Sequence, residues 1–175
     1  MHRRQPLPRL WLMTDERQGD GLWHAIARLP RGAGIIFRHH SLPTAERRAM
    51  FDAVKQRIRG RHLLLLLAGP SGLARAWGAD GSHGRGPGAG LRSAPAHSLR
   101  EIRAAERAGA DLIFLSPVFA TRSHPGRRTL GLIRFGALAR QTRLPVIALG
   151  GVDEKQAAGL LALGAYGWAG IDAWS

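Results

Sequence analysis

The sequence predicts a compact α/β protein folded as a (βα)8 TIM barrel, and three features of its pattern support this fold. Short apolar runs alternate with segments of helical pattern, glycine recurs where the helical segments end, and a glycine pair follows a late apolar run. The chain has 175 residues, which suits one domain spanning residues 1–175. Apolar residues make up 45% of it, enough to build a core.

The apolar runs are the evidence for a parallel sheet. They cover residues 10–13, 34–37, 63–67, 112–115 and 146–149. They are apolar throughout, which is typical of strands covered on both faces. Helical patterns between them cover residues 21–29, 44–57, 98–108, 132–141 and 154–163. Ser98 followed by Glu101 predicts a capping box, and Asp153 is placed to cap the helix that begins at Glu154.

The glycines that end the helices indicate a repeat. Gly78, Gly109 and Gly164 each follow a helical pattern and precede a short strand-like run, as expected of left-handed helix caps. Gly78 and Gly109 are 31 positions apart, close to the ~31 residues per unit of a ~250-residue eightfold barrel. Weaker runs at residues 79–83, 91–95 and 166–169 bring the strand count to eight.

One unit of the repeat is shortened. Residues 84–90 read Gly-Arg-Gly-Pro-Gly-Ala-Gly, a composition that cannot form a helix. We therefore expect a degenerate helix between strands 4 and 5. An open, doubly wound sheet of five or six strands is the alternative architecture.

The composition restricts the partners. The net charge of +14 arises from 26 basic and 12 acidic residues, a balance that suits phosphorylated small molecules or nucleic acid. The arginines are scattered and Tyr166 is the only tyrosine, so a stacking surface for nucleic acid is not indicated. There is no cysteine, and no apolar run approaches the ~20 residues of a membrane span. We expect a cytoplasmic protein with neither a membrane nor a nucleic-acid partner.

The candidate site residues follow the predicted strands, because a (βα) barrel carries its active site at the C-terminal strand ends. Gly150 and Gly151 precede a capped helix, which predicts a phosphate cup of backbone amides; an ordinary tight turn is the alternative. Thr121 and Ser123 offer hydroxyls to a pyrophosphate or a substrate ring, unless they belong to a polar surface loop. Arg38, at the end of the second strand, can clamp a phosphate.

The remaining polar residues give no metal site. The histidines lack the HxH and HExxH spacings of metal ligands. We expect His39 and His40 at a loop surface. Asp80 and Asp111 fall at predicted strand starts, the structural end of a barrel, and are left out of the site.

Five segments, in order along most of the chain, resemble the thiamine phosphate synthase family. Residues 78–83 (GADGSH) resemble the family's GADGVH, and residues 96–101 (AHSLRE) its S-x-H-S-x-x-E segment. Residues 109–121, which include SPVFAT, resemble its GADY…GPVFPT run. Residues 145–152 (PVIALGGV) resemble PVVAIGGI, and residues 164–169 (GAYGWA) resemble GA-x-G-V-A.

The resemblance implies an activity and a set of site residues. The family is a (βα)8 barrel that joins hydroxymethylpyrimidine diphosphate to a thiazole phosphate, with Mg²⁺, and releases pyrophosphate. By resemblance, Thr121 and Ser123 touch the diphosphate or the thiazole substrate. The resemblance also implies that Gly150 and Gly151 hold the thiazole phosphate, with the backbone at Ile171 and Asp172 completing that cup.

This chain departs from the family pattern at several charged positions. Arg38 matches the first residue of the family's R-E-K segment, but two histidines replace the others. The family's Asn-Asp pair falls near residues 68–70, and its second Mg²⁺ aspartate falls in the shortened segment 85–90; neither stretch holds a carboxylate. His124 replaces a lysine, and Asp172 replaces a small hydroxyl residue. The resemblance implies Mg²⁺ as cofactor, but its ligands are not found here.

Two other functions therefore stay open beside the synthase. The family's thiazole tautomerase branch needs a phosphate cup and a histidine acid/base but no metal, and His97 matches its histidine. A histidine that merely packs is the alternative for His97. A non-catalytic barrel that binds a phosphorylated ligand or a protein is the third hypothesis. The expected ligand is a phosphorylated small molecule, and a homodimer is compatible with the fold.

Overall fold

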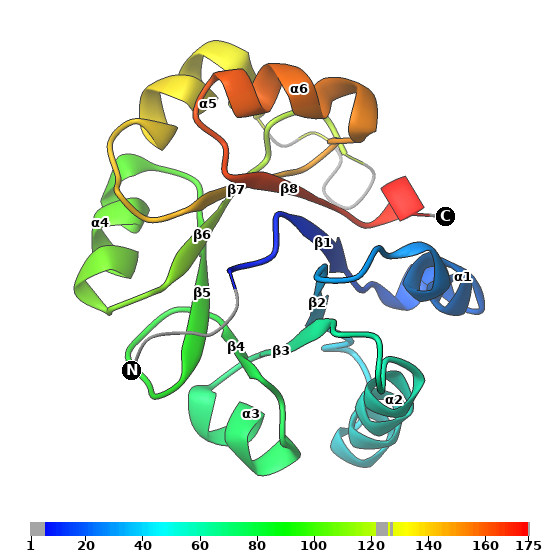
Figure 1. The fold of residues 1–175 in the computed structure, drawn as a ribbon. Helices are drawn as coiled ribbons and strands as arrows, with labels where there is room; N and C mark the ends of the chain where they lie inside the picture. The colour runs from blue at the N-terminus through cyan, green and yellow to red at the C-terminus, as the bar shows by residue number, and fades with distance from the viewer. Residues whose placement is uncertain (1–5, 122–125, 127, 175) are drawn as a thin grey trace.

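Eight parallel strands form one closed barrel in sequence order (Figure 1). The computed structural model describes residues 6–121, 126 and 128–174. Each strand pairs with the next along the chain, and β8 pairs with β1. The strands are β1 (Leu10–Met13), β2 (Gly34–Phe37), β3 (Leu64–Ala68), β4 (Gly81–His83), β5 (Leu91–Ala96), β6 (Leu112–Leu115), β7 (Val146–Leu149) and β8 (Gly167–Gly170). The predicted (βα)8 barrel is confirmed, and the open doubly wound sheet is wrong because the sheet has no edge.

The described helices lie outside the strands (Figure 1). They are α1 (Gly21–Arg28), α2 (Thr44–Arg57), α3 (Ser71–Trp77), α4 (Leu99–Arg107), α5 (Gly131–Ala139) and α6 (Glu154–Ala162), with short 3-10 helices η1 (Glu16–Gln18) and η2 (Asp172–Trp174). The sequence pattern missed α3, since seven residues give less than two full turns of periodicity. The other five α-helices match the predicted segments to within one or two residues at each end.

No helix separates β4 from β5, as the glycine-rich segment predicts. The side chain of Arg92, on β5, fills part of the space instead and is only 6% exposed. Its guanidinium donates hydrogen bonds to the carbonyls of Gly86 (3.0 Å) and Ala108. A buried guanidinium needs acceptors, and these carbonyls connect the shortened loop to the end of α4.

The core has one cluster inside the barrel and two between the strands and the helices. Inside, Trp11 and Phe114 meet edge to face with ring centroids 5.3 Å apart. Gly34 makes room for this packing, because a Cβ there would lie 2.2 Å from the Trp11 ring. Aromatic packing of this kind fills the barrel below its C-terminal rim.

The helix boundaries follow the predicted chemistry with one correction. Gly78, Gly109 and Gly164 have φ of 67°, 74° and 103°, the positive values that glycine tolerates. Asp153 forms the capping box of α6. Ser98 accepts from the backbone N–H of Glu101, but the Glu101 carboxylate accepts from the N–H of His97 rather than Ser98. The predicted box at α4 is therefore shifted by one residue on its return side.

Two aspartates at strand starts are structural, as predicted. Asp80 accepts from the backbone N–H of Leu65, and Asp111 from that of Arg92, both at 2.8 Å. Each carboxylate thereby links neighbouring strands at the N-terminal end of the barrel. Among the residues described, no helix has the length and hydrophobicity needed to cross a membrane.

Candidate functional site

A cavity of about 330 Å³ opens at the C-terminal ends of β7 and β8. Five of the predicted site residues line it: Thr121, Gly150, Gly151, Ile171 and Asp172. They come from three separate segments, those that directly follow β6, β7 and β8. The closed barrel brings these connections together on one rim.

Both the backbone conformation at positions 150 and 151 and the close approach of the loop after β6 require glycine there. Gly150 and Gly151 have φ of 98° and 63°. A Cβ at Gly150 would lie 2.8 Å from the Cα of Pro117, and one at Gly151 would lie 2.3 Å from the carbonyl oxygen of Ala120. The missing side chains therefore admit the β6 loop, so the glycine pair allows a close packing that goes beyond the ordinary tight turn of the alternative interpretation.

The backbone amides of this turn are available to a ligand. Among the described residues, the N–H groups of Gly150, Gly151 and Val152 have no hydrogen-bond acceptor. The next N–H, of Asp153, donates to Gln156 in the capping box. Unpaired amides that precede a helix N-terminus attract anions. This corner can bind an oxyanion.

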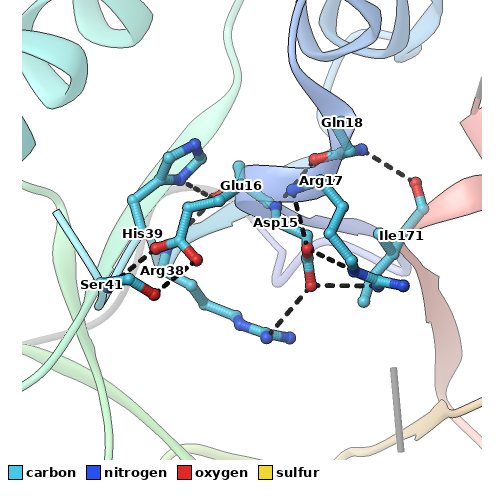
Figure 2. Close-up of polar contacts among 9 residues, drawn as sticks. Asp15, Glu16, Arg17, Gln18, Arg38, His39, Ser41 and Ile171 are labelled. Carbon is cyan, nitrogen blue, oxygen red and sulfur yellow. Dashed lines mark hydrogen bonds and ion pairs between the residues drawn. The ribbon is translucent and has the colours of Figure 1, made fainter. Parts of the chain in front are cut away.

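A second polar group lies beside the cup, at the ends of β1 and β2 (Figure 2). Asp15 accepts from the backbone N–H and Nε of Arg17, at 3.1 and 2.8 Å, and its other oxygen contacts Arg38 at 3.4 Å. Burial opposes ionisation of Asp15, but these hydrogen bonds and both positive charges outweigh it and hold its pKa below the usual value. Gln18 donates to the carbonyl of Ile171 at 3.0 Å, which connects this group to the cup.

The sequence interpretation missed Asp15 and Arg17, although a signal was present. Thr14, Asp15 and Glu16 follow β1 directly, and polar residues after a barrel strand are site candidates.

Neighbouring residues fix the backbone at Arg38. Thr14 Oγ1 accepts from the backbone N–H of Arg38 at 2.9 Å and contacts His39 Nδ1 at 3.0 Å. His39 stacks on Phe37 with centroids 4.7 Å apart and is 5% exposed, so its predicted position at a loop surface is wrong. Burial lowers the pKa of His39, and burial followed by the charges of Arg47 and Arg38 lowers that of His40. Both imidazoles are therefore neutral at pH 7.

His97 lies at the end of β5, away from the residues that line the cup. Its Nδ1 donates to the carbonyl of Ser116, on the neighbouring strand end, at 2.7 Å. This bond fixes the proton on Nδ1 and leaves Nε2 as the basic nitrogen. The ring is only partly buried, and this tautomer suits a proton acceptor.

His83 forms a second buried imidazole group inside the rim. Its Nδ1 lies 2.8 Å from Ser93 Oγ, and its ring meets Phe114 edge to face. Burial, with smaller contributions from the charge of Arg38 and from His40 when it is protonated at acidic pH, lowers the pKa of His83 to about 3. The ring is thus neutral and forms a polar part of the barrel interior.

The carboxylates of the rim do not fit a bound Mg²⁺. Within the described ranges, no three His, Cys, Asp or Glu side chains gather into a metal site. Asp15 is engaged by two arginines, and Glu16 accepts from the backbone N–H and hydroxyl of Ser41, both at 2.9 Å. Mg²⁺ needs oxygen ligands in near-octahedral geometry, and the ends of β3 and β4 provide none from side-chain carboxylates.

The outcome for the predicted residues differs from one to the next. The five cup residues meet at one cavity, Arg38 joins Asp15 beside it, and His97 stands apart, directly after β5. Ser123 and His124 lie outside the described residues. Asp172, which replaces a small hydroxyl residue of the family, acts with its charge on Arg17 and raises the pKa of that guanidinium, after the larger effect of Asp15.

This arrangement defines a class: (βα)8 barrels with a site after strands 7 and 8, where many such barrels bind phosphate. The family model "Thiamine monophosphate synthase" matches residues 93–174. An Aquifex aeolicus protein named for a second thiamine-phosphate synthase is 32% identical over 94% of this chain and 96% of its own. The thiamine-phosphate synthase of Methanoculleus marisnigri is 33% identical over 94% of this chain and 86% of its own.

A solved structure agrees with these relatives. Thiamine phosphate pyrophosphorylase from Pyrococcus furiosus superposes with a TM-score of 0.78 at 26% identity, over 94% of this chain and 85% of that one. The chain belongs to the thiamine monophosphate synthase family, as its sequence motifs predict.

Proposed function

We propose that this chain is a thiamine-biosynthetic transferase that couples hydroxymethylpyrimidine diphosphate to thiazole phosphate. One observation carries the proposal: the cavity of about 330 Å³ in which residues from three strand ends surround backbone amides that have no acceptor among the described residues. A phosphate of the thiazole substrate fits the requirement of those amides for an anion. Family membership supplies the substrate class.

The reaction suits a site that mainly binds anionic oxygen. The C–O bond between the pyrimidine methylene and the diphosphate breaks, and the electron pair leaves with the diphosphate oxygen. The thiazole phosphate captures the resulting carbocation, and pyrophosphate is released. The protein lowers the barrier by neutralising charge on the departing oxygen. Gly150 and Gly151 would hold one substrate, while Arg38 would face the leaving group of the other, with Thr121 between them.

The test is a direct coupling assay on the purified full chain. Formation of thiamine phosphate and pyrophosphate from the two substrates supports the transferase. Gly150→Asp places a carboxylate against the cup and should abolish saturation by thiazole phosphate through charge repulsion. Turnover that is unchanged in this variant would overturn the assignment of the cup. The matched control is Gly159→Asp, on the exposed side of α6.

A second candidate rests on the geometry of His97. The bond from Nδ1 to Ser116 leaves Nε2 as a base, which a metal-independent thiazole tautomerase would need to move a proton. Conversion of thiazole carboxylate phosphate by the wild type, lost in His97→Ala while phosphate binding persists, would support this function. Equal rates in both proteins would exclude it.

If neither reaction proceeds but phosphates raise the melting temperature, the chain is a phospho-ligand-binding barrel. We assign the protein to the cytoplasm with a phosphorylated small molecule as its ligand. A homodimer is the assembly to test, by light scattering of the purified chain.

A further inference from the structure

We infer that this chain binds the diphosphate of its substrate without a divalent cation, between the guanidinium groups of Arg17 and Arg38 that Asp15 holds side by side. The inference rests on the proposed function for the identity of the substrate. It departs from the Mg²⁺ requirement of the family. What carries it is the contact geometry of the three side chains.

One carboxylate brings the two guanidinium groups together. Oδ1 of Asp15 takes the Nε of Arg17 at 2.8 Å, and Oδ2 takes a terminal nitrogen of Arg17 at 3.2 Å and of Arg38 at 3.4 Å. The two like charges are thus held close by a shared anion. Figure 2 shows Arg17 and Arg38 approaching Asp15 from different sides. They come from η1 and the end of β2, so their spacing is set by the barrel.

The two arginine side chains of this group are more exposed to solvent than the aspartate. The Asp15 side chain is 10% exposed, whereas those of Arg38 and Arg17 are 24% and 49% exposed. An anion that approaches from solvent therefore meets guanidinium groups before it meets the carboxylate. Arg38 makes one side-chain hydrogen bond among the described residues, and a guanidinium has five N–H donors. Paired arginines suit phosphate oxygens because their planar forks bind two oxygens at once.

The other charges near this group are already engaged or absent. Arg47 donates to the carbonyls of Arg38 and Ala68, at 2.9 and 2.7 Å, so it supports the strand ends. His40 is neutral, and Glu16 is hydrogen-bonded to Ser41. Asp172 acts on Arg17, so an incoming anion must compete with it. A diphosphate competes better than a monophosphate because it carries more charge.

The same charges disfavour a metal ion at this place. A divalent cation beside two guanidinium groups is repelled, and each rim carboxylate already has a cationic or hydrogen-bonding partner. Arginine can provide the positive charge that a departing diphosphate requires. The two arginines then take the electrostatic role that a metal has elsewhere.

The experiment is a calorimetric titration of inorganic pyrophosphate into the full chain, in EDTA and in Mg²⁺. We expect the affinity in EDTA to stay within about threefold of that in Mg²⁺. Arg17→Ala and Arg38→Ala should each weaken binding about tenfold or more, because each removes charged hydrogen bonds. Arg17→Lys should restore part of the loss. The control is Arg31→Ala, an exposed residue that precedes β2 at the opposite end of the barrel.

The outcomes separate this inference from the proposed function. Binding that requires Mg²⁺, or arginine variants that bind like Arg31→Ala, would overturn the inference while the coupling assay decides the function independently. Pyrophosphate binding in EDTA with no binding of thiazole phosphate would overturn the proposed function and leave the metal-free diphosphate site standing, with the identity of the substrate open. Circular dichroism of each variant establishes that a lost affinity is not lost folding.

Discussion

The tight packing of Gly151 against the β6 loop makes Gly151→Ala the most informative single substitution. Its φ of 63° would cost a side chain roughly 1–2 kcal/mol. The new Cβ would lie 2.3 Å from the carbonyl oxygen of Ala120 and 2.9 Å from the Cβ of Phe119. Because the nearest neighbour is backbone, the loop that carries Thr121 must move away from the cup. We expect both stability and phosphate affinity to fall.

The conformational cost alone predicts a lower melting temperature by roughly 2–8 °C, at about 2–4 °C per kcal/mol for a chain of this size. The assay combines thermal unfolding by circular dichroism with titration of thiazole phosphate. Gly159→Ala is the matched control, because Gly159 is helical and a Cβ there meets nothing within 4 Å. That variant should be more stable by roughly 0.5–1 kcal/mol. Equal stability and affinity in Gly151→Ala and the wild type would refute the reasoning.

Two further predictions concern buried polar side chains. Burial lowers the pKa of His83 to about 3 in the folded protein, whereas an unfolded chain protonates a histidine at ~6.5. Between these two pH values the unfolded state binds more protons than the folded state. The free energy of unfolding therefore falls as the pH drops through this window. Urea midpoints at pH 7 and pH 4.5 should differ less in His83→Gln than in the wild type, and an identical difference would contradict the assignment. Arg92→Met loses the charged bonds to the carbonyls of Gly86 and Ala108 and should cost roughly 1.5–3 kcal/mol. Urea unfolding measures this loss of stability, with the exposed Arg100→Met as the control. Equal urea midpoints in the two variants would contradict the prediction.

Local signals in the sequence were sufficient for most of the fold. The strands at residues 10–13, 34–37, 112–115 and 146–149 match the structure residue for residue, because a strand buried on both faces must be apolar throughout. The left-handed glycines and the missing helix after β4 could also be predicted from the sequence, since both depend on the backbone preferences of single residue types. The short helix α3 and the partner of Glu101 were not, because they depend on neighbours rather than on periodicity.

The candidate site divides in the same way. The sequence by itself determined the glycine pair, its capped helix and the family, all of which are properties of contiguous residues. Only the tertiary structure decided that Asp15, from the end of β1, holds Arg17 and Arg38 together, and that Gln18 meets Ile171 across the closure between β8 and β1. Residues 153 positions apart meet there because the closed barrel joins its first strand to its last. Hydrogen bonds and ion pairs act over a few ångströms of space, whatever the separation along the chain.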